Sequence, residues 1–208
     1  MYHEKCQGPF CSSCSIVLGS GSPRRRDLLR QLGLSFSVCT GRVRELDDSS
    51  GLYPDKLTMQ NAILKLEAVK DLCSADVIIC ADTCVYCSGK IFGKPVNFEH
   101  AVDMLARLSG RWHKVYTSFA LFRREKGQLR KRTVVSRVFI DVINRDVLCA
   151  YCNSSEPYDK AGGYAIQGTG AFLVRQIEGS YTNVVGLPVT ELVKDLLELG
   201  AIKPCVNG

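Results

Sequence analysis

Five consecutive apolar residues, Val77 to Ala81, are followed directly by a carboxylate, Asp82. An apolar run of this length is typical of a strand that is buried on both faces of its sheet. Strands of this kind occur in α/β proteins, where helices cover both faces of the sheet. The run therefore favours an α/β fold, and it draws attention to the carboxylate at its end.

Strand and helix signals alternate along the rest of the chain. The apolar segment Ser15–Leu18 leads through a glycine turn to Ser22, which has N-cap chemistry, and to Pro23, which suits the first helical position. Similar patterns predict strands at Ser35–Cys39 and Phe172–Ile177, a strand pair about Ser88 and Gly89, a hairpin of Val115–Arg123 and Thr133–Ile143, and helices at Asp55–Leu72, Phe98–Leu108, Asp146–Cys152 and Pro188–Leu199. We predict a mixed central sheet flanked by helices over residues 16–203, with residues 1–15 as a flexible extension outside the fold.

Composition excludes several classes of protein. Apolar residues make up 46% of the chain, which suits a globular core and excludes disordered and fibrous classes. No run reaches the roughly 18 to 20 uncharged apolar residues that a membrane span needs, and the first fifteen residues lack a signal-peptide pattern. We therefore expect a cytoplasmic protein with no membrane partner. The net charge of +6 suits phosphate-bearing ligands, but it is too small and dispersed to require nucleic acid.

The chain has eleven cysteines, three pairs of which have Cys-x-x-Cys spacing. A structural zinc site is one interpretation of such pairs. Against it, Cys84 and Cys87 fall in a predicted strand, where an offset of three sends side chains to opposite faces. Cys11 and Cys14 lie in the predicted extension. We expect buried or unreactive thiols rather than structural zinc.

Three arginines, Arg24 to Arg26, occupy the first turn of the first predicted helix, where they oppose the helix macrodipole. An anion bound there would offset this charge. A glycine turn that leads into a helix also offers free backbone N–H groups. The turn therefore suits a phosphate, with Ser20, Gly21, Ser22, Arg24 and Arg25 as the cradle. The alternative is a solvated basic turn.

Asp82 is the second candidate, because the C-terminal end of a buried strand is where open α/β sheets place their ligands. The alternative for Asp82 is an ordinary turn aspartate at the end of a strand. Lys94 and Lys160 lie in predicted loops nearby. The segments Tyr164–Gly168 and Glu178–Asn183 carry aromatic and amide groups that suit a nucleobase.

Taken in order, these segments resemble the motifs of the Maf family of nucleoside triphosphate pyrophosphatases. The resemblance covers residues 16 to 200 and is carried by Leu18-Gly19-Ser20-Gly21-Ser22-Pro23-Arg24-Arg25, Ala81-Asp82-Thr83, Gly93-Lys94-Pro95, Tyr158-Asp159-Lys160-Ala161-Gly162-Gly163-Tyr164-Ala165-Ile166-Gln167-Gly168 and Glu178-Gly179-Ser180-Tyr181-Thr182-Asn183-Val184-Val185-Gly186-Leu187-Pro188. It implies a single elongated α/β domain similar to the Maf and inosine triphosphatase fold, and a homodimer.

The resemblance also implies an activity, which is hydrolysis of dTTP and UTP, and of modified pyrimidine nucleotides, to the monophosphate and pyrophosphate with Mg²⁺ or Mn²⁺. In that assignment Asp82 either accepts a proton from water or holds the metal, two roles that the sequence does not separate, and Glu45 is the other candidate metal ligand. Substrate-binding residues would be Ser20, Ser22, Arg24, Arg25, Lys65, Thr83, Lys94, Lys160 and Gln167, of which Arg24, Thr83 and Gln167 are tied to substrate choice.

Three positions depart from the family pattern. Gly19 replaces the usual alanine, Leu66 stands where alanine follows the helix lysine, and Arg44-Glu45 replaces an acidic pair, which puts the role of Glu45 in question. Two other functions stay open from the sequence. One is a pyrophosphatase for inosine or 7-methylguanosine triphosphate, and the other is a nucleotide-binding regulator without turnover.

Overall fold

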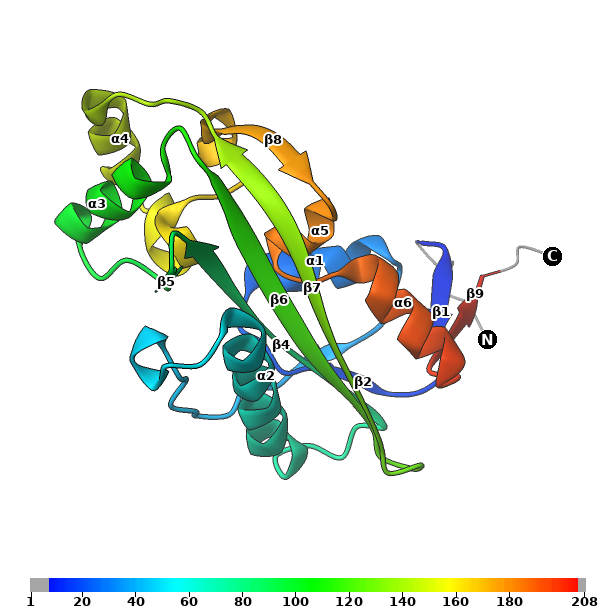
Figure 1. The fold of residues 1–208 in the computed structure, drawn as a ribbon. Coiled ribbons are helices and arrows are strands. Elements are labelled where there is room, and N and C mark those ends of the chain that lie inside the picture. The colour runs from blue at the N-terminus through cyan, green and yellow to red at the C-terminus, as the bar shows by residue number, and fades with distance from the viewer. Residues whose placement is uncertain (1–7, 206–208) are drawn as a thin grey trace.

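A computed structural model describes residues 8–205, and it shows an elongated α/β domain built on long central strands (Figure 1). The strands are β1 (Phe10–Ser12), β2 (Ile16–Leu18), β3 (Ser37–Val38), β4 (Val77–Cys87), β5 (Lys90–Phe92), β6 (Trp112–Arg123), β7 (Gln128–Ile140), β8 (Val174–Glu178) and β9 (Ile202–Pro204). The helices are α1 (Pro23–Gln31), α2 (Pro54–Lys70), α3 (Phe98–Leu108), α4 (Arg145–Cys152), α5 (Tyr181–Val185) and α6 (Val189–Glu198), with short 3-10 turns between them.

The main sheet is mixed, as the sequence predicts. Its strand order is β3-β2-β4-β6-β7-β8, with β5 also paired to β4. Strand β2 runs parallel to β3 and β4, and the other pairs are antiparallel. The long strands β4, β6 and β7 extend through the whole domain (Figure 1) and give it its elongated shape.

Strand β4 is buried on both faces, which confirms the interpretation of its apolar run. Successive side chains of a strand point to opposite faces. Val77, Ile79 and Ala81 pack in a cluster with residues of α1 and α6, whereas Ile78 and Cys80 pack on the other face with residues of α2. All five side chains are fully buried. A third cluster forms where α3 and α4 cover the far end of the sheet.

The predicted helix ends agree closely with the structure. Helix α1 starts at Pro23 after Ser22, and Gly33 follows the helix with φ of 78°. Asn97 caps α3 by accepting a hydrogen bond from the His100 N–H. Among residues 8–205 no helix has the length and apolar character needed to cross a membrane. The predicted strand Phe172–Ile177 begins two residues later, because a 3-10 turn takes up Thr169–Leu173.

The expectation that residues 1–15 lie outside the fold is wrong for the part of this segment that the structure describes. Strand β1 pairs antiparallel with β9 near the C-terminus. Cys11 forms a disulfide with Cys205, 194 residues away in sequence, and Phe10 packs against the core cluster of α1 and α6. Neither strand has a strong local signal, since each is three residues long. Residues 1–7 lie outside the described residues.

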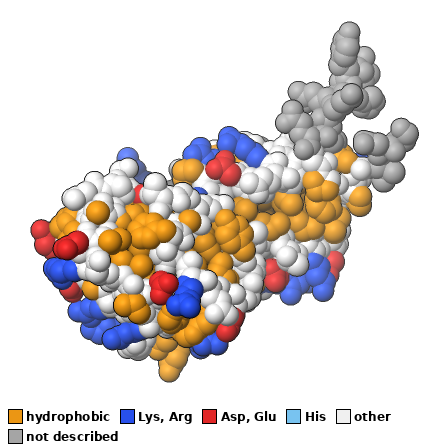
Figure 2. All heavy atoms as spheres, turned by 90° about the horizontal axis from the view of Figure 1, so that it is seen from above, with side chains coloured by type: hydrophobic (Ala, Val, Ile, Leu, Met, Phe, Trp, Pro, Cys, Tyr) orange, Lys and Arg blue, Asp and Glu red, His pale blue; other side chains and the backbone are white. Residues whose placement is uncertain are grey.

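One face of the domain carries a band of apolar side chains between charged groups of both signs. Figure 2 shows this band on the face seen from above. Over the described surface as a whole, the large hydrophobic residues that are exposed include Val135, Val142, Phe172 and Tyr181.

Gly19 follows β2 and lies directly against Cys80 of β4. A Cβ atom at Gly19 would lie 2.2 Å from the Cys80 sulfur, which no real pair of atoms tolerates. Gly19 has no positive φ, so its backbone conformation would accept alanine. The family's alanine at position 19 would therefore clash with Cys80 in this structure.

We predict that Gly19→Ala lowers the free energy of unfolding by about 1 to 3 kcal/mol, because it overpacks a filled core. Adding Cys80→Ala should recover most of this loss, which a double-mutant cycle of denaturant unfolding measures. Gly21→Ala is the control, since a Cβ atom at Gly21 meets nothing within 4 Å. The steric explanation would be contradicted if Gly19→Ala lowered the free energy of unfolding equally in the parent and in the Cys80→Ala variant.

His113 of β6 is buried, and its Nε2 lies 2.6 Å from the Tyr164 hydroxyl. Burial lowers the pKa of His113 from 6.5 to about 4. The unfolded chain therefore binds a proton at this imidazole between pH 6.5 and 4, whereas the folded protein does not. Stability should fall as pH falls through this window.

We predict that His113 contributes about 2 kcal/mol to the loss of stability between pH 7 and pH 5. His113→Gln keeps a hydrogen-bonding group for Tyr164 but cannot take up the proton, so its stability should depend less on pH. Thermal unfolding at both pH values measures the effect, with the exposed His100→Gln as control. If the stability of the parent and of His113→Gln depended on pH in the same way, His113 would not be the cause of the loss of stability.

Candidate active site

A cleft of about 1090 Å³ lies between the start of α1, helix α2, the middle of β4 and the 3-10 turns after α4. The catalytic, metal-binding and substrate-binding residues that the family resemblance implies all line this cleft, namely Ser20, Ser22, Arg24, Arg25, Glu45, Lys65, Asp82, Thr83, Lys94, Lys160 and Gln167. The fold thus brings together side chains that come from seven separate segments of the chain.

The cleft opens at a gap along one edge of β4. On this side β4 pairs with β2 up to Ile79 and with β5 from Val85 onward. Asp82 lies in the gap between these two partners. The expectation that Asp82 ends its strand is therefore wrong, because β4 continues to Cys87 and pairs with β5 as a hairpin. Asp82 nevertheless lies just beyond the C-terminal end of the parallel strand β2, where the edge becomes open.

Arg25 fills part of this gap. Its Nε donates to the Gly186 carbonyl at 2.7 Å, and one terminal nitrogen donates to the Ala81 carbonyl at 2.9 Å and to the Ser20 hydroxyl at 3.0 Å. The other terminal nitrogen donates to Thr83 Oγ1 at 3.0 Å. Burial lowers the pKa of Arg25, against the attraction of nearby carboxylates. Four of the five guanidinium N–H groups thus bind protein atoms, so Arg25 joins α1 to the open edge of β4.

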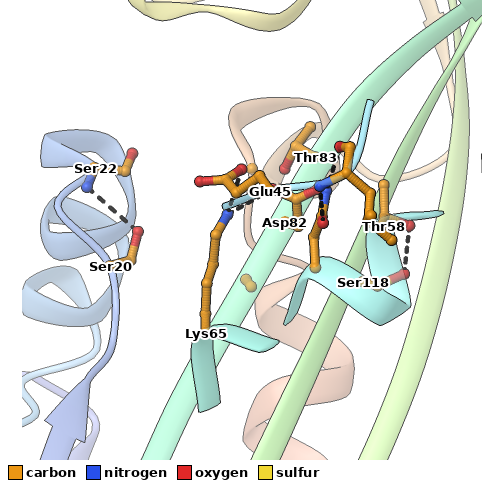
Figure 3. Close-up of polar contacts among 12 residues, drawn as sticks. Ser20, Ser22, Glu45, Thr58, Lys65, Asp82, Thr83 and Ser118 are labelled. Atoms are coloured by element: carbon orange, nitrogen blue, oxygen red, sulfur yellow. Dashed lines mark hydrogen bonds and ion pairs between the residues drawn. The ribbon is translucent and has the colours of Figure 1, made fainter. Parts of the chain in front are cut away.

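Two carboxylates meet at the ammonium group of Lys65. Its Nζ lies 2.7 Å from Asp82 Oδ1 and 2.9 Å from Glu45 Oε2 (Figure 3). Burial raises the pKa of Asp82, and the charge of Lys65 opposes this rise. Burial acts in the same direction on the more exposed Glu45, but Lys65 outweighs it and holds the pKa of Glu45 below its usual value.

The other cations lie around the rim. Arg24 donates to the Asp159 carboxylate at 3.0 Å, and Lys160 forms an ion pair with the same carboxylate and donates to the Glu156 carbonyl at 2.7 Å. Lys94 is exposed and close enough to Glu45 to help lower its pKa. Asp159 therefore offsets part of the positive charge that the sequence analysis expected a bound anion to offset.

The turn before α1 presents Ser20 and Ser22 to the cleft. The backbone N–H of Ser22 donates to the Ser20 hydroxyl at 3.3 Å (Figure 3). Ser22 occupies the N-cap position, but its side chain makes no capping bond. The first turn of α1 consequently keeps backbone N–H groups available for an anion.

The segment Tyr164–Gly168 borders the cleft as expected, with Gln167 half-buried. The Glu156 carboxylate fixes the end of this segment by accepting from the backbone N–H groups of Thr169 at 3.0 Å and Gly170 at 2.7 Å. Thr83 lies deeper in the cleft, where its hydroxyl contacts Arg25 and lies 3.0 Å from Thr117 Oγ1.

The segment Glu178–Asn183 does not supply the base-binding groups that the sequence suggested. Its last residues start helix α5, and Asn183 is fully buried, with its amide donating to the Val115 carbonyl and to Ser136. Asn183 therefore joins α5 to the strands β6 and β7. The residues that follow it, Val184 to Gly186, line the cleft instead.

Sequence analysis missed two residues of the site. Asp159 binds Arg24 and Lys160 from within a motif that had been noted only for its lysine. Asn61 donates to Asp82 Oδ2 at 3.1 Å. Its signal in the sequence is a polar residue placed four positions before Lys65, on the same face of a helix.

Among residues 8–205 no cluster of three or more His, Cys, Asp or Glu side chains could hold a metal ion. The carboxylates that face the cleft beside each other are those of Asp82 and Glu45, both paired with Lys65. The expectation of buried or unreactive thiols is wrong for Cys11, which forms a disulfide with Cys205.

Comparison with known proteins gives several similar sequences. A family model described as "Maf-like protein" matches residues 15–199. A dTTP/UTP pyrophosphatase of Syntrophus aciditrophicus is 43% identical over 90% of this chain and 91% of its own length. Proteins of the same description from Geobacter sulfurreducens and Gloeobacter violaceus are 42% and 43% identical, over 90% and 88% of this chain and 97% and 95% of their own lengths.

Among solved structures, a Mycobacterium abscessus nucleoside-triphosphatase described as a dITP/XTP pyrophosphatase aligns over 89% of this chain and 94% of its own, with a TM-score of 0.39 and 12% identity. This likeness is too slight to support a structural argument. The sequence relatives are much more similar, and the family model spans the whole cleft-forming region. This chain therefore belongs to the family of Maf-like proteins.

Proposed function

We propose that this protein hydrolyses dTTP and UTP to the monophosphate and pyrophosphate. The observation that carries the proposal is the pairing of Asp82 and Glu45 about Lys65 inside a cleft whose rim is basic. The description of the relatives as dTTP/UTP pyrophosphatases supports the choice of substrates. Assaying pyrophosphate release from each triphosphate with Mg²⁺ or Mn²⁺ tests the proposal.

The triphosphate would bind along the basic rim. Such a ligand carries close to four negative charges, and Arg24, Lys94 and Lys160 all line the cleft, where Arg24 and Lys160 contact the same Asp159 carboxylate. Hydrogen bonds from charged donors to phosphate are about twice as strong as neutral ones. The free backbone N–H groups at the start of α1 add further donors.

Asp82 is the proposed proton acceptor. Its carboxylate would take a proton from a water molecule, whose oxygen attacks the α-phosphorus. The bond from that phosphorus to the oxygen bridging it to the β-phosphorus then breaks, and pyrophosphate leaves. Lys65 favours the ionised form of Asp82 in spite of its burial. Arginine and lysine at the rim stabilise the charge that develops on the leaving group.

The carboxylate pair fits Mg²⁺ or Mn²⁺. These ions prefer oxygen ligands, and Mg²⁺ in nucleotide sites is usually held by one or two carboxylates together with substrate phosphates. Asp82 and Glu45 would hold it, since both face the cleft where the phosphates would lie. When bound, the cation would neutralise phosphate charge.

We also propose that the protein acts as a homodimer in the cytoplasm. The apolar band on one face of the domain supports association, since exposed apolar patches commonly mark interaction surfaces (Figure 2). A free nucleoside triphosphate is the proposed partner of the cleft.

We predict that Asp82→Asn lowers kcat on the order of 100-fold or more, because asparagine can neither accept the proton nor offer a full charge to the metal. Thermal unfolding should confirm that the variant is folded. Asp103→Asn, which removes a carboxylate from a surface ion pair with Arg107, is the matched control and should keep the parent's kcat. Turnover by Asp82→Asn within a few-fold of the parent would exclude Asp82 from the reaction.

The choice of base should depend on Gln167, whose amide offers both a donor and an acceptor to uracil or thymine. We predict that dTTP and UTP are cleaved faster than ATP, GTP or 7-methylguanosine triphosphate, since a site built for one base leaves polar groups unpaired with another. Gln167→Ala should narrow the gap by impairing dTTP and UTP most. The measurement is kcat/KM for the panel on both proteins, with the exposed Gln128→Ala as control. If the ratio of kcat/KM for dTTP and UTP to that for the purine triphosphates is unchanged in Gln167→Ala, Gln167 has no role in the choice of base.

A further inference from the structure

We propose that Asn61 is a positioning residue that fixes the relative placement of Asp82 and Glu45. The inference rests on the proposed hydrolase function and extends it to a residue outside the set that the family resemblance supplies. It is carried by the hydrogen bonds of one buried amide, which join the two carboxylate-bearing segments to helix α2.

Asn61 is buried, with 2% of the residue exposed, and both ends of its side-chain amide form hydrogen bonds. Its Oδ1 accepts from the Leu46 N–H at 2.8 Å, and its Nδ2 donates to the Leu46 carbonyl at 3.0 Å. The second hydrogen of Nδ2 is directed to Asp82 Oδ2 at 3.1 Å. The Asn61 side chain thus binds both backbone polar groups of Leu46 and one carboxylate oxygen of Asp82.

Asn61 and Lys65 act together because they lie four residues apart, one above the other on α2. Asn61 holds Oδ2 of Asp82, and Lys65 holds Oδ1. Both oxygens of this carboxylate are therefore oriented by one rigid helix. The plane of the Asp82 carboxylate cannot turn without breaking one of these two hydrogen bonds.

Glu45 is held by the same pair of residues. Its side chain is half exposed, so burial contributes little to its placement. Lys65 pairs with its carboxylate, and Asn61 anchors the backbone of Leu46, the next residue in the chain. Without this anchor the segment that carries Glu45 would depend on one ion pair with a long, flexible lysine side chain.

A purely structural role is a poor explanation of an amide at this position. The neighbouring inward residues of α2, Ala62, Leu66 and Val69, are apolar and fully buried. A buried amide gives little net stability over an apolar side chain of similar size, because its hydrogen bonds replace bonds to water. What an apolar residue could not supply is the orientation of Asp82 and of the Leu46 backbone.

Two variants separate these contacts. Asn61→Leu removes all three bonds at similar volume. Asn61→Asp keeps the acceptor for the Leu46 N–H but replaces Nδ2, the donor to both Asp82 and the Leu46 carbonyl, by an oxygen. The matched control is Thr58→Val on the same helix, since Thr58 is also fully buried and its hydroxyl contacts Ser118 and the Pro54 carbonyl but no residue of the site (Figure 3).

With dTTP and UTP as substrates, kcat should fall about 10- to 100-fold in Asn61→Leu and Asn61→Asp and stay near the parent's value in Thr58→Val. KM should stay within about threefold in all of them, because the phosphate-binding cations are untouched. Hydrogen exchange supplies a readout that is independent of turnover. The Leu46 amide should lose protection in Asn61→Leu and keep it in Asn61→Asp.

Parental kcat in a folded Asn61→Asp would overturn the positioning role while leaving the proposed function intact. A loss of kcat in Thr58→Val as large as in Asn61→Leu would also overturn it, because general destabilisation of α2 would then be sufficient. Undiminished protection of the Leu46 amide in Asn61→Leu would contradict the backbone anchor. If the parent itself releases no pyrophosphate from any triphosphate, the proposed function fails, and the positioning role fails with it.

Discussion

The open edge of β4 between β2 and β5 is the constraint on which the site depends. A buried strand edge carries backbone groups that need partners, since an unpaired one costs free energy comparable to a lost hydrogen bond. Arg25 supplies the partner for the Ala81 carbonyl in the middle of the gap, and the same guanidinium binds the Gly186 carbonyl and Thr83. The gap therefore stays open to ligands without leaving this carbonyl unpaired, and the buried Asp82 faces the cleft from within β4.

Within the cleft, cationic and anionic side chains also pair with one another. Lys65 lies between Asp82 and Glu45, and Arg24 and Lys160 share the carboxylate of Asp159. Partly buried cations without partners would be costly, so these pairs keep long basic side chains in place. A triphosphate in the cleft, as proposed, would compete with Asp159 for cations that are already oriented. The half-exposed Asp159 can return to solvent at little cost, whereas Asp82 is buried and keeps its place.

Local signals predicted most of the fold. The N-cap at Asn97, the αL glycine at Gly33 and the apolar run of β4 act over a few residues, and the structure shows each of them. Pairings between distant segments could not be predicted in this way. The β1–β9 pair joins segments near the two ends of the chain. The strand pair about Ser88 and Gly89 was predicted, but its first strand proves to be a continuation of Val77–Ala81, so Asp82 lies inside β4 rather than at its end. The motifs found the cleft residues, but motif positions say nothing of side-chain partners such as those of Asn183 and Asn61.

The departures from the family pattern fall into two kinds once the packing is known. Gly19 and Leu66 both border the cluster behind the site, where Leu66 is buried with Cys80 and where the Cys80 sulfur leaves no room for a Cβ at Gly19. Both positions are thus set by packing around Cys80, although Gly19 also lines the cleft. Glu45 is different, because its carboxylate lies 2.9 Å from Lys65 Nζ, in contact with the same ammonium as Asp82. Replacing the first residue of the acidic pair by Arg44 thus leaves in place the carboxylate that faces Lys65, which supports a role for Glu45 beside Asp82.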